Sequence, residues 1–501
     1  MLIEEHRYLA KGVISLASIV LLLAAEVALM AAADAGPARV YRLGDWPAPF
    51  GIVLVADRLA AAMVLLVGVL GFAAMIFSLA RWHRAGPRFH ALLQFLLMGL
   101  NGAFLTGDVF NLFVFFELFL AASYGLALHG SGPARVRASL HYIIVNLTAS
   151  LLFLVGATLL YGVAGTLNMA DLAARAPGIG AADRVLFEAG AAILGIAFLV
   201  KAAMWPLGFW LPATYAAAAA PVAAVFAVLS KVGVYAVLRV WLLLFGEGSG
   251  ASAGFGADGL FYGGLVTLAF GVIGVAASQQ LTHVAGFSLI VSAGTLLAAI
   301  GWSELAVTGA ALYYLVVSTL GVSALYMLIE LVERTRGPGA DILAVTAEAF
   351  GDAEVEPEPE EEVGFAIPAT MALLGLSFAA CALILAGLPP MPGFLAKFAL
   401  LAALLETEPV PMAGWVLLAL LIASGLAAIV AMGRAGVRIF WATQIPAPPR
   451  VRVLELAPVA LLIALSVSLT LQAEPAMRYL QQAAQALHAP GGYIDEVLRP
   501  R

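Results

Sequence analysis

The sequence has little charge and almost no cysteine. Only 11% of its 501 residues are charged, whereas a soluble protein carries about 25%. The one cysteine, Cys381, excludes an internal disulfide framework. No two histidines have metal-ligand spacing, and there is no phosphate loop, dinucleotide glycine fingerprint or nucleophile elbow. We therefore expect no metal, no cofactor and no nucleic-acid partner, and an energy source outside this chain.

Apolar residues are abundant and fall in long runs. Hydrophobic residues make up 63% of the chain, and runs of about 20 such residues are long enough to cross a bilayer as a helix. The pattern predicts an all-α polytopic membrane protein, with 1–501 as a single transmembrane domain. We expect about 13 spans, at 12–33, 55–80, 89–106, 108–128, 140–164, 187–205, 214–244, 258–278, 282–301, 305–332, 365–404, 411–433 and 453–473.

The loops indicate an orientation. Most loop arginines and lysines fall on the side that carries the N-terminus, so the positive-inside rule places the N-terminus in the cytoplasm and the C-terminus outside. The loop 334–363 includes the acidic run GDAEVEPEPEEE, which is typical of a solvated, disordered segment; contact with a basic partner surface is the alternative. The tail 474–501 is expected to form a short amphipathic helix at the membrane surface.

Two apolar stretches are interrupted by proline beside a lysine. The first, 193–240, contains Lys201 and Lys231, with breaks predicted at Pro206 and Pro212. Broken helices at membrane depth line cavities or pack inside protein. The second stretch, 380–404, has the same features, namely Pro389, Pro390 and Lys397. Two interrupted helices in corresponding places point to inverted repeats and an ion path between them.

Ionisable side chains in apolar helices are usually functional. A desolvated lysine loses its proton more readily, so Lys201, Lys231 and Lys397 suit proton loading and release. Snorkelling to the interface is the alternative for each lysine. Glu117, among phenylalanines, is predicted to pair with Lys201, either to bias its protonation or as a static ion pair. Asp108 is expected to cap the helix that carries Glu117.

Two histidines open predicted spans. His141 is at the start of the fifth span and His283 at the start of the ninth. Each is either a proton relay or an ordinary residue at a helix start.

Several motifs resemble one known family. The segments LTGDVFNLFVFFELFLAASYGL, FWLPATYAAAAAPVAAVFAVLSKVGVYAVLRV and LAGLPPMPGFLAKFALL are similar to the D subunit of the multisubunit Mrp (Pha, Mnh) monovalent cation/proton antiporter. More distantly, the chain resembles the antiporter-like subunits of respiratory complex I. The resemblance implies an antiporter-like fold of 14 helices with two inverted repeats, here 108–244 and 258–433. It also implies a proton-handling core, which by motif is Glu117, Lys201, Lys231 and Lys397.

The chain departs from the family pattern at four places. The usual first helix is missing from the span count, and Ala213 replaces the usual acid after Trp210-Leu211-Pro212. One later helix of the family usually begins with an acidic and a basic residue, where this chain has Gln280-Leu281-Thr282-His283. The next helix of the family often carries a histidine, where this chain has Val317-Ser318. Either water, Ser318 and Thr319 substitute for these groups in the proton link between Lys231 and Lys397, or this half of the protein conducts protons poorly.

The resemblance implies a proton-translocating subunit of a K⁺/H⁺ or Na⁺/H⁺ antiporter in the bacterial plasma membrane. Its partners would be the other Mrp subunits, monovalent cations, protons and lipid. Two alternatives remain. One is a proton-pumping membrane-arm subunit of a complex I-like or hydrogenase-like enzyme. The other is a structural subunit without transport.

Overall fold

The computed structural model describes residues 7–86, 88–334, 369–406, 409–441 and 451–499. The described part is almost entirely helical, as predicted, apart from an antiparallel hairpin of β1 (Arg39–Arg42) and β2 (Val53–Ala56) that the sequence analysis missed. The longer helices are α1 (Tyr8–Asp34), α2 (Arg58–Leu79), α3 (Phe89–Leu105), α4 (Val109–Ala127), α5 (Pro133–Ala164), α7 (Ala181–Lys201), α9 (Ala220–Phe245), α10 (Ala257–Ala277), α11 (Leu281–Trp302), α12 (Leu305–Glu333), α14 (Ala369–Ala386), α15 (Pro392–Leu405), α16 (Met412–Phe440) and α17 (Val453–Leu471).

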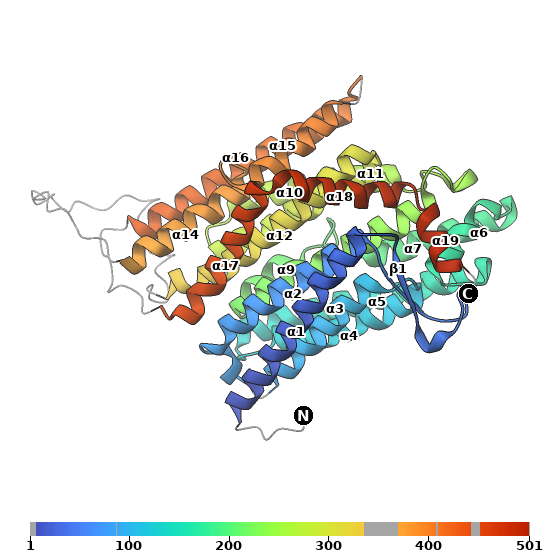
Figure 1. Cartoon of the computed structure of the whole chain (residues 1–501). Coiled ribbons are helices and arrows are strands. Elements are labelled where there is room, and N and C mark those ends of the chain that lie inside the picture. Colours follow the sequence, from blue (N-terminus) through green and yellow to red (C-terminus); the bar gives the residue numbers. More distant parts are fainter. Residues whose placement is uncertain (1–6, 87, 335–368, 407–408, 442–450, 500–501) are drawn as a thin grey trace, which may run out of the picture.

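Most of these helices run side by side, as Figure 1 shows. Among the described residues, 11 helices are long and apolar enough to cross a membrane, and Phe89–Leu105 and Pro392–Leu405 are shorter apolar helices. The chain is therefore a multi-pass membrane protein. The exact number of 13 spans stays a prediction, because some predicted spans correspond to short or broken helices.

The core lies around α9. Every residue of α9 is buried, and α9 packs against α2, α7, α11 and α12. By contrast, only 17% of the apolar window of α1 is buried. Lys231 thus lies on a fully buried helix, while α1 forms an outer edge of the described bundle.

Side-chain caps fix two helix starts near the core. Asp108 accepts a hydrogen bond of 2.8 Å from the backbone N–H of Asn111, so it caps α4 as predicted. Asp57 caps α2 in the same way, accepting 2.9 Å from Ala60 N–H. These bonds satisfy N–H groups that have no partner inside the first helical turn.

Both predicted helix breaks are present in the structure, but only one of the two prolines predicted at the first break lies in it. After α7 ends at Lys201, the chain leaves helical geometry and restarts as α8 (Trp210–Ala217). Pro206 lies in this break. Pro212 does not, because it sits in the first turn of α8, where a missing N–H costs no intrahelical bond. The predicted span 214–244 therefore divides into the end of α8 and α9.

The second break follows α14 and precedes α15. It contains Pro389 and Pro390, as predicted, and begins at Gly387, whose positive φ of 76° favours glycine.

The C-terminal tail folds back over the bundle. It forms α18 (Ala473–His488) and α19 (Gly491–Leu498), and two smaller helices elsewhere are α6 (Met169–Arg175) and α8. One face of α18, including Leu480, Ala484 and Leu487, is buried against α12, which agrees with the predicted amphipathic helix. In Figure 1, α18 runs obliquely across the other helices. The acidic loop 334–363 lies outside the described residues except for Arg334.

Candidate functional site

Glu117 and Lys201 meet through a serine that the sequence analysis missed. The Ser150 hydroxyl on α5 donates a hydrogen bond to Glu117 Oε1 on α4. Lys201 Nζ, at the end of α7, lies 3.5 Å from the same Ser150 Oγ and 5.2 Å from the centre of the Phe116 ring. The predicted pairing is thus mediated by a hydroxyl and supported by a cation–π contact.

The break after α7 sets the position of Lys201. Lys201 is the last residue of α7, where the unpaired carbonyls of the helix end favour a cation. The Trp210 indole N–H, from the first turn of α8, donates to the Val200 carbonyl at 3.3 Å, which also accepts the backbone N–H of Ala203 at 3.1 Å. Gly233 on α9 packs so closely on the backbone of Ala202 that a Cβ would collide with it. The sequence at the break therefore holds the lysine deep in the bundle.

Lys231 begins a chain of hydroxyl groups. Its side chain has 0% exposure, and Nζ donates to Ser292 Oγ on α11 at 2.7 Å. Ser292 Oγ in turn lies 2.9 Å from Ser318 Oγ on α12. The hydroxyls of Ser318 and Thr319 both donate to the Leu315 carbonyl of their own helix, at 3.2 and 2.6 Å. Of these two predicted substitutes for the family's charged residues, Ser318 is the one that also contacts Ser292.

Lys397 lies against the second break. Its Nζ donates to Ser424 Oγ on α16 at 3.0 Å and to the Ala386 carbonyl at 3.2 Å. Ala386 is the last residue of α14, so Lys397, like Lys201, holds its charge at the carbonyl end of a half-helix. Gly387 leaves room for the lysine stem, since a Cβ there would lie 2.6 Å from Lys397 Cδ.

A small cavity lies between Ser318 and Ser424. It has a volume of about 30 Å³ and is lined by residues that include Ser318, Tyr314 and Ser424. A water needs roughly 10–15 Å³ of such space together with polar partners. The cavity therefore has room for water between Ser318, which ends the series of hydroxyl contacts from Lys231, and Ser424, which is bound to Lys397.

A surface groove continues from Lys397 to the outside of the bundle. Its volume is about 290 Å³, and its walls come from α15 and α16, including Phe398, Ile422 and Leu426. Lys397 itself is 9% exposed. Lys397 is the most exposed of the three lysines, since Lys201 is 4% and Lys231 0% exposed.

The histidines do not join these contacts. His141 is exposed on α5, and its Nδ1 lies 3.0 Å from the Arg137 carbonyl one turn earlier. His283 is half-buried in the first turn of α11. The relay role of both imidazoles stays a prediction, and the exposed His141 is badly placed for it.

The arrangement is suited to passing protons rather than to bond-making chemistry. In the described part of the chain, the amines of Lys201, Lys231 and Lys397 contact hydroxyl and carbonyl oxygens. Hydroxyls both donate and accept, so they can relay a proton between amines that are loaded and unloaded. A multi-pass helical protein with buried amines at helix breaks belongs to the class of membrane proteins that move ions or protons.

Comparison with known proteins agrees with this class. Residues 106–426 match the family model described as "NADH:quinone oxidoreductase/Mrp antiporter, TM". The chain is 56% identical to a probable K(+)/H(+) antiporter D subunit of Rhizobium meliloti (strain 1021), covering 99% of this chain and 94% of the relative. It is 35% identical to a Na(+)/H(+) antiporter D subunit of Alkalihalophilus pseudofirmus, covering 92% of this chain and 88% of the relative. The chain belongs to the NADH:quinone oxidoreductase/Mrp antiporter family, and its resemblance to the antiporter D subunits is confirmed.

Solved structures show the same fold. A chain of the Mrp complex from Dietzia sp. DQ12-45-1b matches with a TM-score of 0.82 and 26% identity, covering 98% of this chain and 95% of that chain. A chain of an archaeal membrane-bound sulfane sulfur reductase matches with a TM-score of 0.83 at 22% identity, covering 97% of this chain and 94% of that chain. The second likeness concerns the fold alone.

Proposed function

We propose that this chain is a proton-translocating subunit of a multisubunit monovalent cation/proton antiporter, working with other Mrp subunits. The observation that carries the proposal is the succession of buried contacts from Lys231 through Ser292 and Ser318 to a water-sized cavity, and onward to Ser424 and Lys397. The names of the relatives support the coupling of protons to K⁺ or Na⁺.

In this proposal a proton reaches Lys201, passes to Lys231 and leaves near Lys397. Glu117 biases the charge on Lys201 through the hydroxyl of Ser150, which contacts both groups. Lys397, which lies against the second helix break, is the last amine of this succession. Bacterial relatives support placement in a bacterial plasma membrane, and the loop charges support a cytoplasmic N-terminus and an outer C-terminus.

The first experiment replaces Glu117 and Lys231 separately with alanine in the assembled complex. Cation-induced proton movement in inverted vesicles is expected to fall at least about 100-fold in each, as for the loss of a proton-transfer group. Matched controls are Glu474→Ala, whose side chain is exposed, and Lys11→Ala near the start of α1. Normal antiport in assembled Glu117→Ala and Lys231→Ala complexes would instead favour a structural subunit.

A second candidate is a proton-pumping subunit in the membrane arm of a redox enzyme. The fold of this chain is similar to that of the sulfane sulfur reductase chain, and this similarity supports the second candidate. Affinity purification of the tagged chain distinguishes the two. Small membrane partners without iron–sulfur or quinone-reactive subunits support the antiporter.

A further inference from the structure

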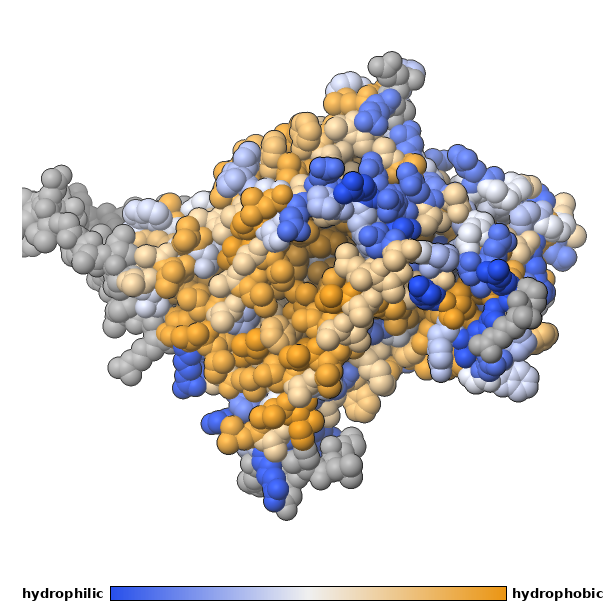
Figure 2. Space-filling model, viewed as in Figure 1, coloured by the Kyte–Doolittle hydropathy of each residue, from blue (hydrophilic) through white to orange (hydrophobic). Residues whose placement is uncertain are grey.

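A deep groove lies outside the lysine path, between α1 and α2 on one side and α12, α17 and α18 on the other. Its volume is about 590 Å³, within the range of about 300–1,000 Å³ typical of small-molecule sites. The part between α2, α12 and α17 is apolar and includes Leu65, Leu66, Leu320 and Leu469. In Figure 2 this face is hydrophobic and hollowed, with hydrophilic residues of α18 along its edge.

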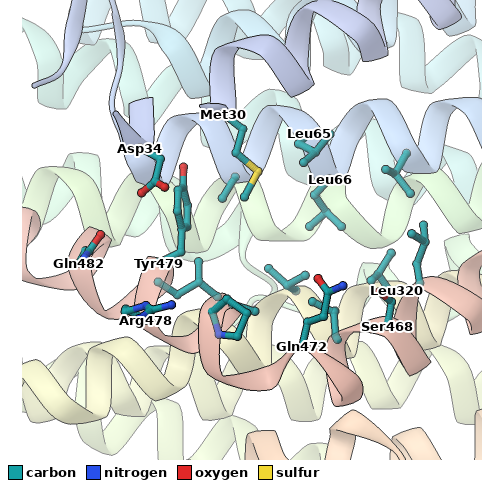
Figure 3. A pocket seen from close by; sticks show the side chains of 18 residues that line it. Met30, Asp34, Leu65, Leu66, Leu320, Ser468, Gln472, Arg478, Tyr479 and Gln482 are labelled. Carbon is teal, nitrogen blue, oxygen red and sulfur yellow. The ribbon is translucent and has the colours of Figure 1, made fainter. Parts of the chain in front are cut away.

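Polar side chains gather at one end of this groove. Figure 3 shows Asp34, Tyr479, Arg478 and Gln482 at that end, with Leu65, Leu66 and Leu320 toward the other, beside the uncharged Gln472 and Ser468. A cavity that is charged at one end and mostly apolar along its length fits an amphiphile rather than a fully polar solute.

The polar end lies at a membrane boundary. There α1 ends at Asp34 and α2 begins at Arg58. Arg58 Nη2 donates to the Asp34 carbonyl at 3.0 Å, and the Tyr479 hydroxyl donates to the Arg58 carbonyl at 3.0 Å. These bonds tie the ends of two spanning helices to α18.

The apolar part reaches about the middle of the bilayer. Val69, which also lines the groove, lies three turns along α2 from Arg58, or about 16 Å by helix rise. The hydrocarbon core is about 30 Å thick. The groove is thus as deep as one leaflet, which is the length that a phospholipid acyl chain occupies.

The polar end offers one charge of each sign. Asp34 and Arg478 have side-chain exposures of 58% and 64%, and their ion pairs are long, 3.4 Å to Arg58 and 3.8 Å to Glu474. Exposed pairs of this kind contribute little stability, so both groups retain the capacity to bind a ligand. A guanidinium favours phosphate and a carboxylate favours an ammonium group.

We propose that this groove binds one phospholipid whose head carries a phosphate and a primary ammonium group, as in phosphatidylethanolamine. The phosphate contacts Arg478, the ammonium contacts Asp34, and one acyl chain lies along Leu65, Leu66 and Leu320. Leu320 belongs to α12, the helix that carries Ser318, so the lipid supports the back of a helix used in the proton path.

The test measures lipid retained by the assembled complex. The complex is purified from membranes containing phosphatidylethanolamine and phosphatidylglycerol, and the phosphatidylethanolamine bound per complex is counted by native mass spectrometry. Arg478→Glu and Leu65→Trp are each expected to lower it about tenfold, as for a lost charge-assisted contact or an occupied groove. Asp34→Asn is expected to lower phosphatidylethanolamine but not phosphatidylglycerol.

Matched controls leave the groove intact. Arg499→Glu changes an arginine whose side chain is 72% exposed on the same tail, and Leu151→Trp enlarges a leucine that is 61% exposed on α5. Both are expected to retain wild-type phosphatidylethanolamine. Equal retention in Arg478→Glu and the wild type overturns the proposal, and so does preferential phosphatidylglycerol binding that Asp34→Asn leaves unchanged. Because the readout is bound lipid, failure of this test leaves the transport proposal intact, and the reverse also holds.

Discussion

Lys231 Nζ donates a hydrogen bond of 2.7 Å to Ser292 Oγ, joining the fully buried α9 to α11. This contact gives the amine a partner that can itself exchange protons. It also sets the order of the hydroxyl contacts, because Ser292 Oγ in turn contacts Ser318 Oγ at 2.9 Å.

Removal of either hydroxyl should slow transport without unfolding the protein. We expect Ser292→Ala and Ser318→Ala to lower cation-induced proton movement in vesicles by about tenfold. This is less than the roughly 100-fold loss typical of a deleted proton-transfer group, because water can fill part of the gap. Ser377→Ala is the matched control, since Ser377 is half-buried and its hydroxyl donates to the Leu373 carbonyl of its own helix. Wild-type rates in both buried serine variants would contradict this route.

The lysines could be predicted from the sequence, but their partners could not. A lysine in a long apolar run is costly and therefore conspicuous. Ser150, Ser292 and Ser424 lie in apolar helices as well, where a serine commonly bonds to the preceding turn and carries no signal. Only helix packing decides which of these hydroxyls faces an amine. The missed partners therefore depend on tertiary structure.

Helix breaks were predictable to within a few residues. Proline marks that a helix stops or starts, but it is compatible with the first turn as well as with the gap. Pro206 fell in the gap and Pro212 in the restarted helix for that reason. The hydroxyl between Glu117 and Lys201 likewise could not be foreseen, because α4, α5 and α7 meet only in three dimensions.

Lys201 should need a neutral form as well as a charged one. Arginine keeps the charge and the capacity to contact Ser150, but it does not deprotonate under working conditions. Lys201→Arg is therefore expected to assemble normally and to reduce antiport about as strongly as Lys201→Ala, measured by the vesicle assay. Antiport near the wild-type level in Lys201→Arg would show that Lys201 acts only as a fixed charge.

Gly233 should be required for the position of Lys201. A Cβ at this residue would collide with the backbone of Ala202, directly after the lysine. Gly233→Ala is expected to lower stability by about 1–3 kcal/mol, the usual cost of overpacking, and to impair antiport. The thermal midpoint of the purified complex and the vesicle assay measure the two effects. Gly162→Ala is the control, because a Cβ there meets no atom within 4 Å; equal behaviour of the two variants would refute tight packing at Gly233.

A buried ion pair between Arg239 and Asp57 should stabilise the C-terminal part of α9. Arg239 Nη2 donates to Asp57 Oδ1 at 2.7 Å, and the Tyr493 ring from α19 lies 5.3 Å from the guanidinium carbon. Loss of one partner of a buried pair costs about 3–5 kcal/mol, because the other charge is left uncompensated.

Asp57→Ala and Arg239→Ala are thus expected to lower the thermal midpoint strongly. Asp57→Leu combined with Arg239→Met should recover part of the loss, since no buried charge remains. The exposed pair Arg478–Glu474, 3.8 Å apart, provides the comparison, and Glu474→Ala should change the midpoint little. A double variant less stable than both single variants would argue against this account.

His129 should make the end of the bundle that follows α4 sensitive to acid. Burial lowers the pKa of its imidazole and the nearby Arg135 guanidinium lowers it further, against the opposite effect of the hydrogen bond with the Trp82 carbonyl. Its Nε2 lies 2.8 Å from that oxygen, so the neutral ring donates a bond there. The unfolded chain, with an ordinary histidine pKa of about 6.5, binds the proton more readily than the folded protein.

Stability from His129 is therefore present above about pH 6.5 and is lost as the pH falls through that value toward the lower pKa of the folded state. The thermal midpoint of the purified complex is expected to drop between roughly pH 7.5 and pH 5.5, and His129→Gln should reduce the drop. His141→Gln changes an exposed histidine and should leave it unaltered. His83 is also buried with a lowered pKa, so part of the wild-type pH dependence should persist in His129→Gln. If the slope in His129→Gln matched the wild type, the acid sensitivity would have to come from another group.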